Sequence, residues 1–261
     1  MNRGRLQAVL YGICAACLIL GTGCATDGQR TAAQRTRTMD FRTIVARYTD
    51  TPVTVDGKLD EPCWQQAIVY PMARGKDRET LNVKIREGGE VMVCWDTTNL
   101  YVGTKFYDSD VVAEGTEDQL HQYGMGDVVE LFLKPEQSPW YWELYATPTA
   151  KKTAFFYPSR GRLGLPSGFK YSSGLKVGAQ VEGTLNNWKD RDAYWTAEMA
   201  MPLADLTANG DKFEPGVPWR IFVGRYNYSF YLSALEYTMV PQLPFSNYHY
   251  ISGYGWLDIV K

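Results

Sequence analysis

The sequence predicts an all-β fold, an antiparallel β-sandwich of two packed sheets, and three observations carry this prediction. Stretches of five to ten residues alternate between apolar and polar side chains, turn-forming residues separate them at sandwich-like spacing, and no segment supports a helix of more than a few turns. The chain has 261 residues, 45% of them hydrophobic, which suits one large domain. We place that domain at residues 44–261.

Two neighbouring strands organise the rest of the predicted domain. In GDVVELFLKP, residues 126–135, period-two alternation puts Val129, Leu131 and Leu133 on one face, which we assign to the core. The other face carries Val128, Glu130 and Phe132, and a face turned to water would hold more than one polar residue. The second strand, residues 140–147, places Tyr141, Glu143 and Tyr145 together in the same way. The sequence therefore predicts a groove floored by two carboxylates and several aromatic rings.

The remaining expected elements follow from the same alternation and from turn residues. Residues 59–67 indicate a short helical segment, and 90–96 with 100–106 indicate a hairpin across the turn TTN. Further strands are expected at 51–55, 83–85, 153–157, 177–182, 194–201, 219–228 and 255–260.

The N-terminus has the features of a bacterial export signal, which we assign to residues 1–23. Arg3 and Arg5 precede an apolar run, residues 6–20, that is short for a membrane span. The following LGTGC resembles a lipoprotein box in which Cys24 is lipidated, while ordinary signal-peptidase cleavage stays open. Residues 24–43 are expected to be a flexible tether, and the protein is expected at the bacterial outer membrane or in the periplasm.

The net charge and the histidine count argue against two classes of ligand, and the cysteines leave two states open. A net charge of −2 and two histidines argue against a nucleic-acid partner and against a multi-histidine metal site. Cys63 and Cys94 remain after the signal, each in an apolar setting, and either a disulfide or two buried thiols is compatible with that setting.

A resemblance to a known family joins these pieces. The stretches VDGKLDEPCWQQA, WDTTNLYVGTKFYDSDV, DVVELFLKP, YWELYATP, YWTAEMAMPLADL, WRIFVGRYNY and NYHYISGYGWLDI occur in the order typical of carbohydrate-binding family 9-like domains. The resemblance covers about residues 53–261. It implies a two-sheet sandwich, structural calcium ions, no organic cofactor, and a face where aromatic rings stack on a sugar while polar groups fix its hydroxyls.

The resemblance also implies site residues. Glu130 and Glu143 would accept hydrogen bonds from sugar hydroxyls, and Tyr123 and Tyr248 match the stacking aromatics. Tyr145 stands where the family has an arginine.

Three further residues are weaker candidates. Arg225 lies on a strand near the same sheet, and its role as a sugar contact or a structural residue stays open. Asp108 and Asp110 open an acidic loop that offers oxygen ligands for calcium but lacks EF-hand spacing, so a solvated loop is the competing interpretation.

The function expected from these observations is non-catalytic binding of an oligo- or polysaccharide. A plant-type β-glycan such as xylan or cellulose is the expected ligand, and glycoside hydrolases are the expected partner proteins. One alternative is a glycoside hydrolase that uses Glu130 and Glu143 as its paired carboxylates. Another is a haem b-binding redox protein, with Met92, Met125, Met199 and Met201 as possible axial ligands.

Overall fold

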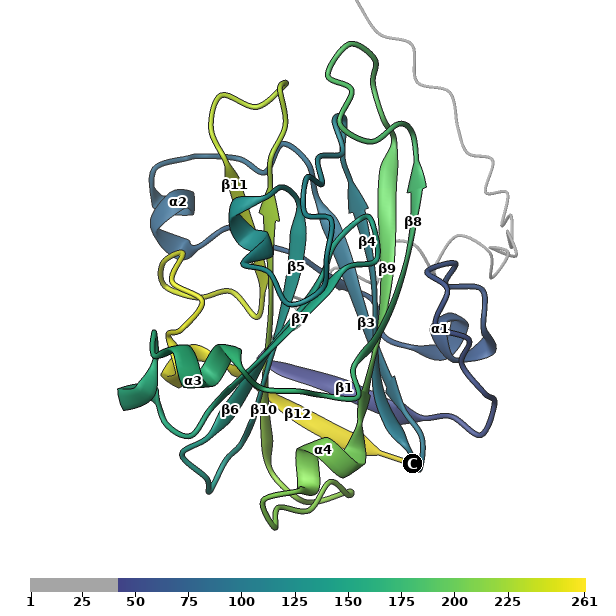
Figure 1. Cartoon of the computed structure of the whole chain (residues 1–261), viewed down its shortest axis with the longest axis vertical. Helices are drawn as coiled ribbons and strands as arrows, with labels where there is room; N and C mark the ends of the chain where they lie inside the picture. Colours follow the sequence, from purple (N-terminus) through teal and green to yellow (C-terminus); the bar gives the residue numbers. More distant parts are fainter. Residues whose placement is uncertain (1–41) are drawn as a thin grey trace, which may run out of the picture. The chain divides into compact units, whose positions relative to one another are not determined.

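Strands dominate residues 42–261, the part of the chain that the computed structural model describes (Figure 1). They are β1 (Thr43–Tyr48), β2 (Tyr70–Pro71), β3 (Gly89–Trp95), β4 (Asn99–Tyr107), β5 (Val128–Pro135), β6 (Tyr141–Ala146), β7 (Lys152–Tyr157), β8 (Lys176–Glu182), β9 (Tyr194–Pro202), β10 (Trp219–Asn227), β11 (Glu236–Val240) and β12 (Gly255–Val260). The expected signal peptide and Cys24 lie outside the described residues.

The helices of this region are all short. The α-helices are α1 (Pro62–Gln66), α2 (Lys76–Thr80), α3 (Pro166–Phe169) and α4 (Leu203–Thr207), and the 3-10 turns are η1 (Gln122–Gly124), η2 (Arg160–Arg162) and η3 (Ile251–Gly253). None of the helices within residues 42–261 is long and apolar enough to cross a membrane.

The predicted β-sandwich is confirmed, with one exception to its antiparallel pairing. The strands pair in the order β7-β6-β5-β10-β12-β1-β3-β4-β9-β8, with β11 on β10 and β2 on β3. This ladder folds back on itself, so that β6 contacts β8 and β9 across the interior, and Figure 1 shows the two resulting layers. The exception is β1, which is parallel to both β12 and β3 and joins the two layers.

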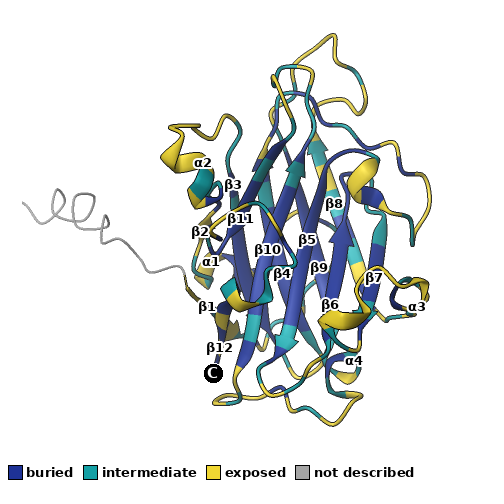
Figure 2. Ribbon diagram, turned by 90° about the vertical axis from the view of Figure 1, so that its left-hand side faces the viewer, coloured by how far each residue is buried: buried dark blue, intermediate teal, exposed yellow. Residues whose placement is uncertain are grey.

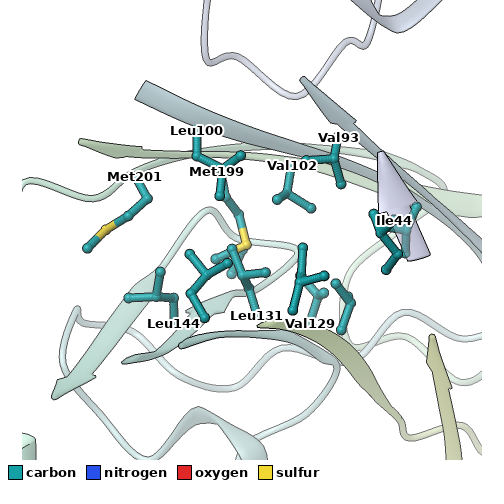
Figure 3. Close-up of a cluster of buried hydrophobic side chains, with 14 of the residues drawn as sticks. Ile44, Val93, Leu100, Val102, Val129, Leu131, Leu144, Met199 and Met201 are labelled. Carbon is teal, nitrogen blue, oxygen red and sulfur yellow. The ribbon is translucent and has the colours of Figure 1, made fainter. Parts of the chain in front are cut away.

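The main core lies between the layers, as the alternation of β5 predicts. Val129, Leu131 and Leu133 are buried there. Figure 3 shows Leu131 and Val129 directed toward Met199 and Val102 of the opposite sheet. Because these inward positions use every second residue of β5, the intervening residues of β5 face outward.

Several expected elements differ from the structure. Residues 51–55 and 83–85 are not strands, since Thr54 donates its N–H to the Glu61 carboxylate and Val83 donates its N–H to the Arg78 carbonyl after α2. The strands β1, β2 and β11 were not predicted. Since β1 begins at Thr43, the last residue assigned to the tether already belongs to the sheet.

The two remaining cysteines are buried free thiols. Cys63 lies in α1 and Cys94 in β3, and no disulfide joins them. A hydrogen bond with Cys63, together with burial, raises the pKa of the Cys94 thiol. The structure therefore selects the buried thiols from the two possibilities that the sequence left open.

Candidate functional site

The outer face of β5, β6, β7 and β10 carries a second apolar cluster rather than a solvated surface. Figure 2 shows these strands largely in the dark blue of buried residues. Residues 243–254, close to the C-terminus, cover part of the cluster. The uncovered part is a pocket of about 520 Å³, which we call the carboxylate pocket. Its lining includes Tyr123, Glu130, Glu143, Tyr145, Phe155, Tyr157, Phe169, Tyr226, Tyr248, His249 and the 163–166 loop.

Glu130 and Glu143 line this pocket from neighbouring strands. In the register of β5 and β6, Glu130 is opposite Tyr145 and Glu143 is opposite Phe132, so the two acids are diagonal neighbours. Both are almost fully buried, with 2% and 3% of their surface exposed. Glu130 Oε1 and Glu143 Oε2 are buried without a hydrogen-bond partner, so each acid keeps an oxygen available to a ligand.

Burial changes the protonation of this pair. Desolvation, reinforced by the charge of Glu143, raises the pKa of Glu130 well above its usual value. Desolvation also raises the pKa of Glu143 to about 7, although the Tyr145 hydroxyl donates a hydrogen bond of 2.5 Å to Glu143 Oε1. His249 Nε2 lies 3.6 Å from Glu143 Oε2. Burial, with the positive charge of Arg160, lowers the pKa of His249 to about 4, so this imidazole is neutral at pH 7 and does not neutralise the acids.

Tyr123 is the exposed aromatic surface of the pocket. It lies in η1, just before β5, and 41% of its surface is exposed. Its ring meets the Tyr145 ring edge-on at 6.4 Å and lies 6.1 Å from the Tyr226 ring. A flat ring held at the pocket by two others matches the apolar face of a pyranose. The structure thus brings together five of the six predicted binding residues at this pocket: Tyr123, Glu130, Glu143, Tyr145 and Tyr248.

The prediction that Tyr248 offers a stacking face requires correction. Tyr248 borders the pocket, but only 5% of its surface is exposed. Its hydroxyl donates to the backbone carbonyls of Arg225 and Thr238, at 2.8 and 2.9 Å. Its ring covers Gly224 so closely that a Cβ there would lie 2.3 Å from it. Tyr248 therefore fastens the covering segment to β10 and β11.

The interpretation of Arg225 as a sugar contact is also wrong. Arg225 points between the two sheets, away from the pocket, and its side chain is 0% exposed. It forms an ion pair of 2.8 Å with Asp108 and donates to the backbone carbonyls of Glu87, Gly88 and Tyr107. Of the two roles that the sequence left open, the structure supports the structural one.

The candidate calcium ligands of the acidic loop, Asp108 and Asp110, are both buried. Asp108 is held by Arg225, and Asp110 accepts the Phe230 N–H through one oxygen while its other oxygen is buried without a partner. Within residues 42–261, no group of three or more acidic, histidine or cysteine side chains is placed to hold a metal ion. Structural calcium, with Asp108 and Asp110 as weak candidate ligands, stays a prediction.

The sequence interpretation did not assign Tyr226, His249, Phe155 and Tyr157 to the site. One signal was present in β10, where alternation puts Arg225 on the side of the core residue Val223 and Tyr226 on the outer side. No comparable signal marked His249, since its place depends on a chain segment that packs over the sheet from more than 100 residues away.

A family model describes most of this architecture. The model for "Carbohydrate family 9 binding domain-like" matches residues 55–213, which include Tyr123, Glu130, Glu143 and Tyr145. The chain belongs to this family. Carbohydrate family 9 domains are non-catalytic binding modules, so the protein is a carbohydrate-binding module and not the glycoside hydrolase considered above. The residues that cover the pocket, beyond residue 213, lie outside the match.

Solved structures share the fold at low sequence identity. A candidate carbohydrate-binding protein from Bacteroides uniformis ATCC 8492 has a TM-score of 0.59 and 12% identity, over 83% of this chain and 98% of that one. A carbohydrate binding module family 9 from Caldicellulosiruptor kristjanssonii in complex with cellotriose has a TM-score of 0.54 and 14% identity, over 84% and 93%. A carbohydrate binding module family 9 from the same organism in complex with glucose has a TM-score of 0.51 and 14% identity, over 83% of this chain and 95% of that one. No curated protein matches the sequence.

Proposed function

We propose that the carboxylate pocket holds an oligo- or polysaccharide, with a plant-type β-glycan such as xylan or cellulose as the natural ligand. The observation that carries this proposal is the pair of buried acids, Glu130 and Glu143, whose unpartnered oxygens line an open pocket beside the exposed Tyr123 ring. A buried oxygen without a partner is costly, and sugar hydroxyls are donors that remove this cost. The glucose- and cellotriose-bound relatives support the ligand class.

Calorimetric titration of the purified protein with glucose, cellotriose and xylotriose tests this assignment. Glu130→Ala should weaken binding by about ten- to a hundredfold, because the sugar hydroxyl bound to this buried carboxyl group would lose its partner, which costs about 1–3 kcal/mol. The matched control is Glu214→Ala, which removes an acid that is 56% exposed and far along the chain.

The result that contradicts the proposal is equally specific. If a glycan binds and Glu130→Ala leaves its affinity unchanged while lowering the melting temperature, the acid is structural and the ligand lies elsewhere. We do not expect a loss of stability, because Glu130 makes no ion pair among the described residues and the core face of β5 is untouched.

The cellular setting is part of the same proposal. The export signal and the LGTGC motif support a mature protein anchored by lipid at Cys24, at the outer membrane or facing the periplasm, where it would hold glycans for glycoside hydrolases. Cys24→Ala should move the protein from the membrane fraction to the soluble fraction. Unchanged fractionation of this variant would exclude the anchor.

A further inference from the structure

A second pocket lies beside the carboxylate pocket and has the opposite charge. It has a volume of about 580 Å³ and is lined by Arg74, Arg78, Lys84 and Arg86, with Tyr237 at one side. None of its lining residues is acidic. We call it the basic pocket.

Its positive charges are only partly neutralised. Arg74 forms an ion pair with the buried Glu236, and Arg78 Nε lies 3.8 Å from Asp77 Oδ2. Lys84 and Arg86 are exposed and have no acidic partner within residues 42–261. The basic pocket therefore has two unpaired cationic side chains.

The positions of these groups are fixed by the backbone. Arg86 donates its backbone N–H to Glu236 at 2.9 Å, which holds this segment against β11 and leaves the guanidinium for a ligand. Arg74 Nε is buried and has no hydrogen-bond partner. A cavity lined by a donor without a partner and by two unpaired cationic side chains can bind an anion.

The two pockets are neighbours. Ser246 lines both of them. The Tyr226 ring of the carboxylate pocket meets the Tyr237 ring of the basic pocket edge-on at 4.9 Å. Tyr123, Tyr226 and Tyr237 therefore form an aromatic path from one pocket to the other, along which consecutive sugars of one chain can lie.

We infer that the basic pocket binds an anionic substituent, the carboxylate of a uronic acid or a sulfate ester, on the same glycan that the carboxylate pocket holds. This inference rests on the proposed function. Guanidinium groups match both anions in bidentate geometry. No lysine or arginine within residues 42–261 lines the carboxylate pocket, so it offers an anion no counter-charge and takes an uncharged sugar, while the basic pocket takes the acidic one. The ligand class is thus an acidic polysaccharide.

The test compares neutral and acidic oligosaccharides on the full chain by calorimetric titration. The probes are xylotriose, xylotriose with one glucuronic acid branch, trigalacturonic acid, a sulfated galactose trisaccharide, and glucuronate or inorganic sulfate alone, at about 50 and 500 mM NaCl. We expect at least one acidic oligosaccharide to bind about tenfold more tightly than the neutral one at low salt, and this preference to shrink at high salt.

The double variant Lys84→Ser/Arg86→Ser should remove the preference and leave xylotriose affinity unchanged. The matched control is Lys176→Ser/Lys212→Ser, which removes two exposed lysines that line neither pocket. Arg74 is left intact because its loss would leave the buried Glu236 unpaired.

Each outcome separates the two proposals. Equal affinity for neutral and acidic probes overturns the basic-pocket inference and leaves the proposed function standing. Binding of sulfate or glucuronate alone, without any gain for acidic oligosaccharides, also overturns it. If acidic oligosaccharides bind and depend on Lys84 and Arg86 but not on Glu130, the carboxylate pocket is excluded as the glycan site, and the inference falls with the proposed function on which it rests.

Discussion

Two sets of buried charges lie on opposite faces of the same sheet, and their surroundings differ. Arg225 and Asp108 lie between the sheets, have opposite charges 2.8 Å apart, and are both 0% exposed. Glu130 and Glu143 lie on the outer face, have like charges, and line a pocket with unpartnered oxygens. The first set is neutralised within the protein, whereas the second set can be satisfied only by a proton or a ligand.

This difference separates structural from binding residues more clearly than burial does. Each of these four residues has at most 3% of its surface exposed, so burial alone would assign all four to the core. Arg225 also has a buried atom without a partner, its Nε, so what distinguishes Glu130 and Glu143 is the pocket that both of them line. The comparison predicts that mutations in the first set act on stability and that mutations in the second set act on binding and pH dependence.

The largest expected effect is on the Arg225–Asp108 pair. Arg225→Met should lower the free energy of unfolding by about 3–5 kcal/mol, because it leaves the Asp108 carboxylate buried without its counter-ion. Urea denaturation measures this loss. The control is Arg220→Met, which breaks an ion pair with Glu136 whose side chains are 22% and 31% exposed, and should cost about 1 kcal/mol or less. Similar losses in both variants would contradict the structural role of Arg225.

The second effect is a fall in stability as the pH rises. The pKa of Glu143 is raised from 4.5 to about 7, so between these values the folded protein binds more protons than the unfolded chain. The free energy of unfolding should therefore decrease with rising pH across this window, by up to about 3 kcal/mol from this residue.

Asp108 contributes in the same direction, since burial raises its pKa to about 6, so a variant is needed to isolate Glu143. Glu143→Gln should reduce the slope between pH 4.5 and 7, where Asp108 and Glu130 still contribute, while Glu136→Gln, at the surface, should leave it as in the unmodified protein. Urea denaturation across this pH range measures how the free energy of unfolding of each variant changes with pH. Identical pH profiles for Glu143→Gln and the unmodified protein would mean that Glu143 is solvated.

The sequence predicts the environment of a side chain where that environment depends on nearby residues of the same strand, and not where it depends on distant segments of the chain. The alternation in β5 and β6 placed Glu130 and Glu143 on one outer face, because successive side chains of a strand lie on opposite faces of the sheet. The same alternation in β10 places Arg225 on the inner face, so the sequence already argued against a sugar contact by Arg225. Tyr248 is buried by hydrogen bonds to other strands, and His249 reaches Glu143 and Tyr141 from more than 100 residues away, so alternation along one strand encodes neither position.

The smallest expected effect compares two tyrosines of the carboxylate pocket. Tyr123 is 41% exposed and Tyr248 is 5% exposed, so only the first offers a ring face to a sugar. Tyr123→Ala should weaken binding by about two- to tenfold, the effect of about 0.5–1.5 kcal/mol for a stacked ring.

Tyr248→Phe should leave affinity unchanged, since its ring stays over Gly224. It should instead lower stability by about 1 kcal/mol, because the carbonyls of Arg225 and Thr238 lose their shared donor. Calorimetric titration with one oligosaccharide, together with thermal melts, measures both quantities. A loss of affinity in Tyr248→Phe equal to that in Tyr123→Ala would show that the Tyr248 hydroxyl reaches the ligand, and the division of the pocket into an exposed binding ring and a buried fastening ring would be wrong.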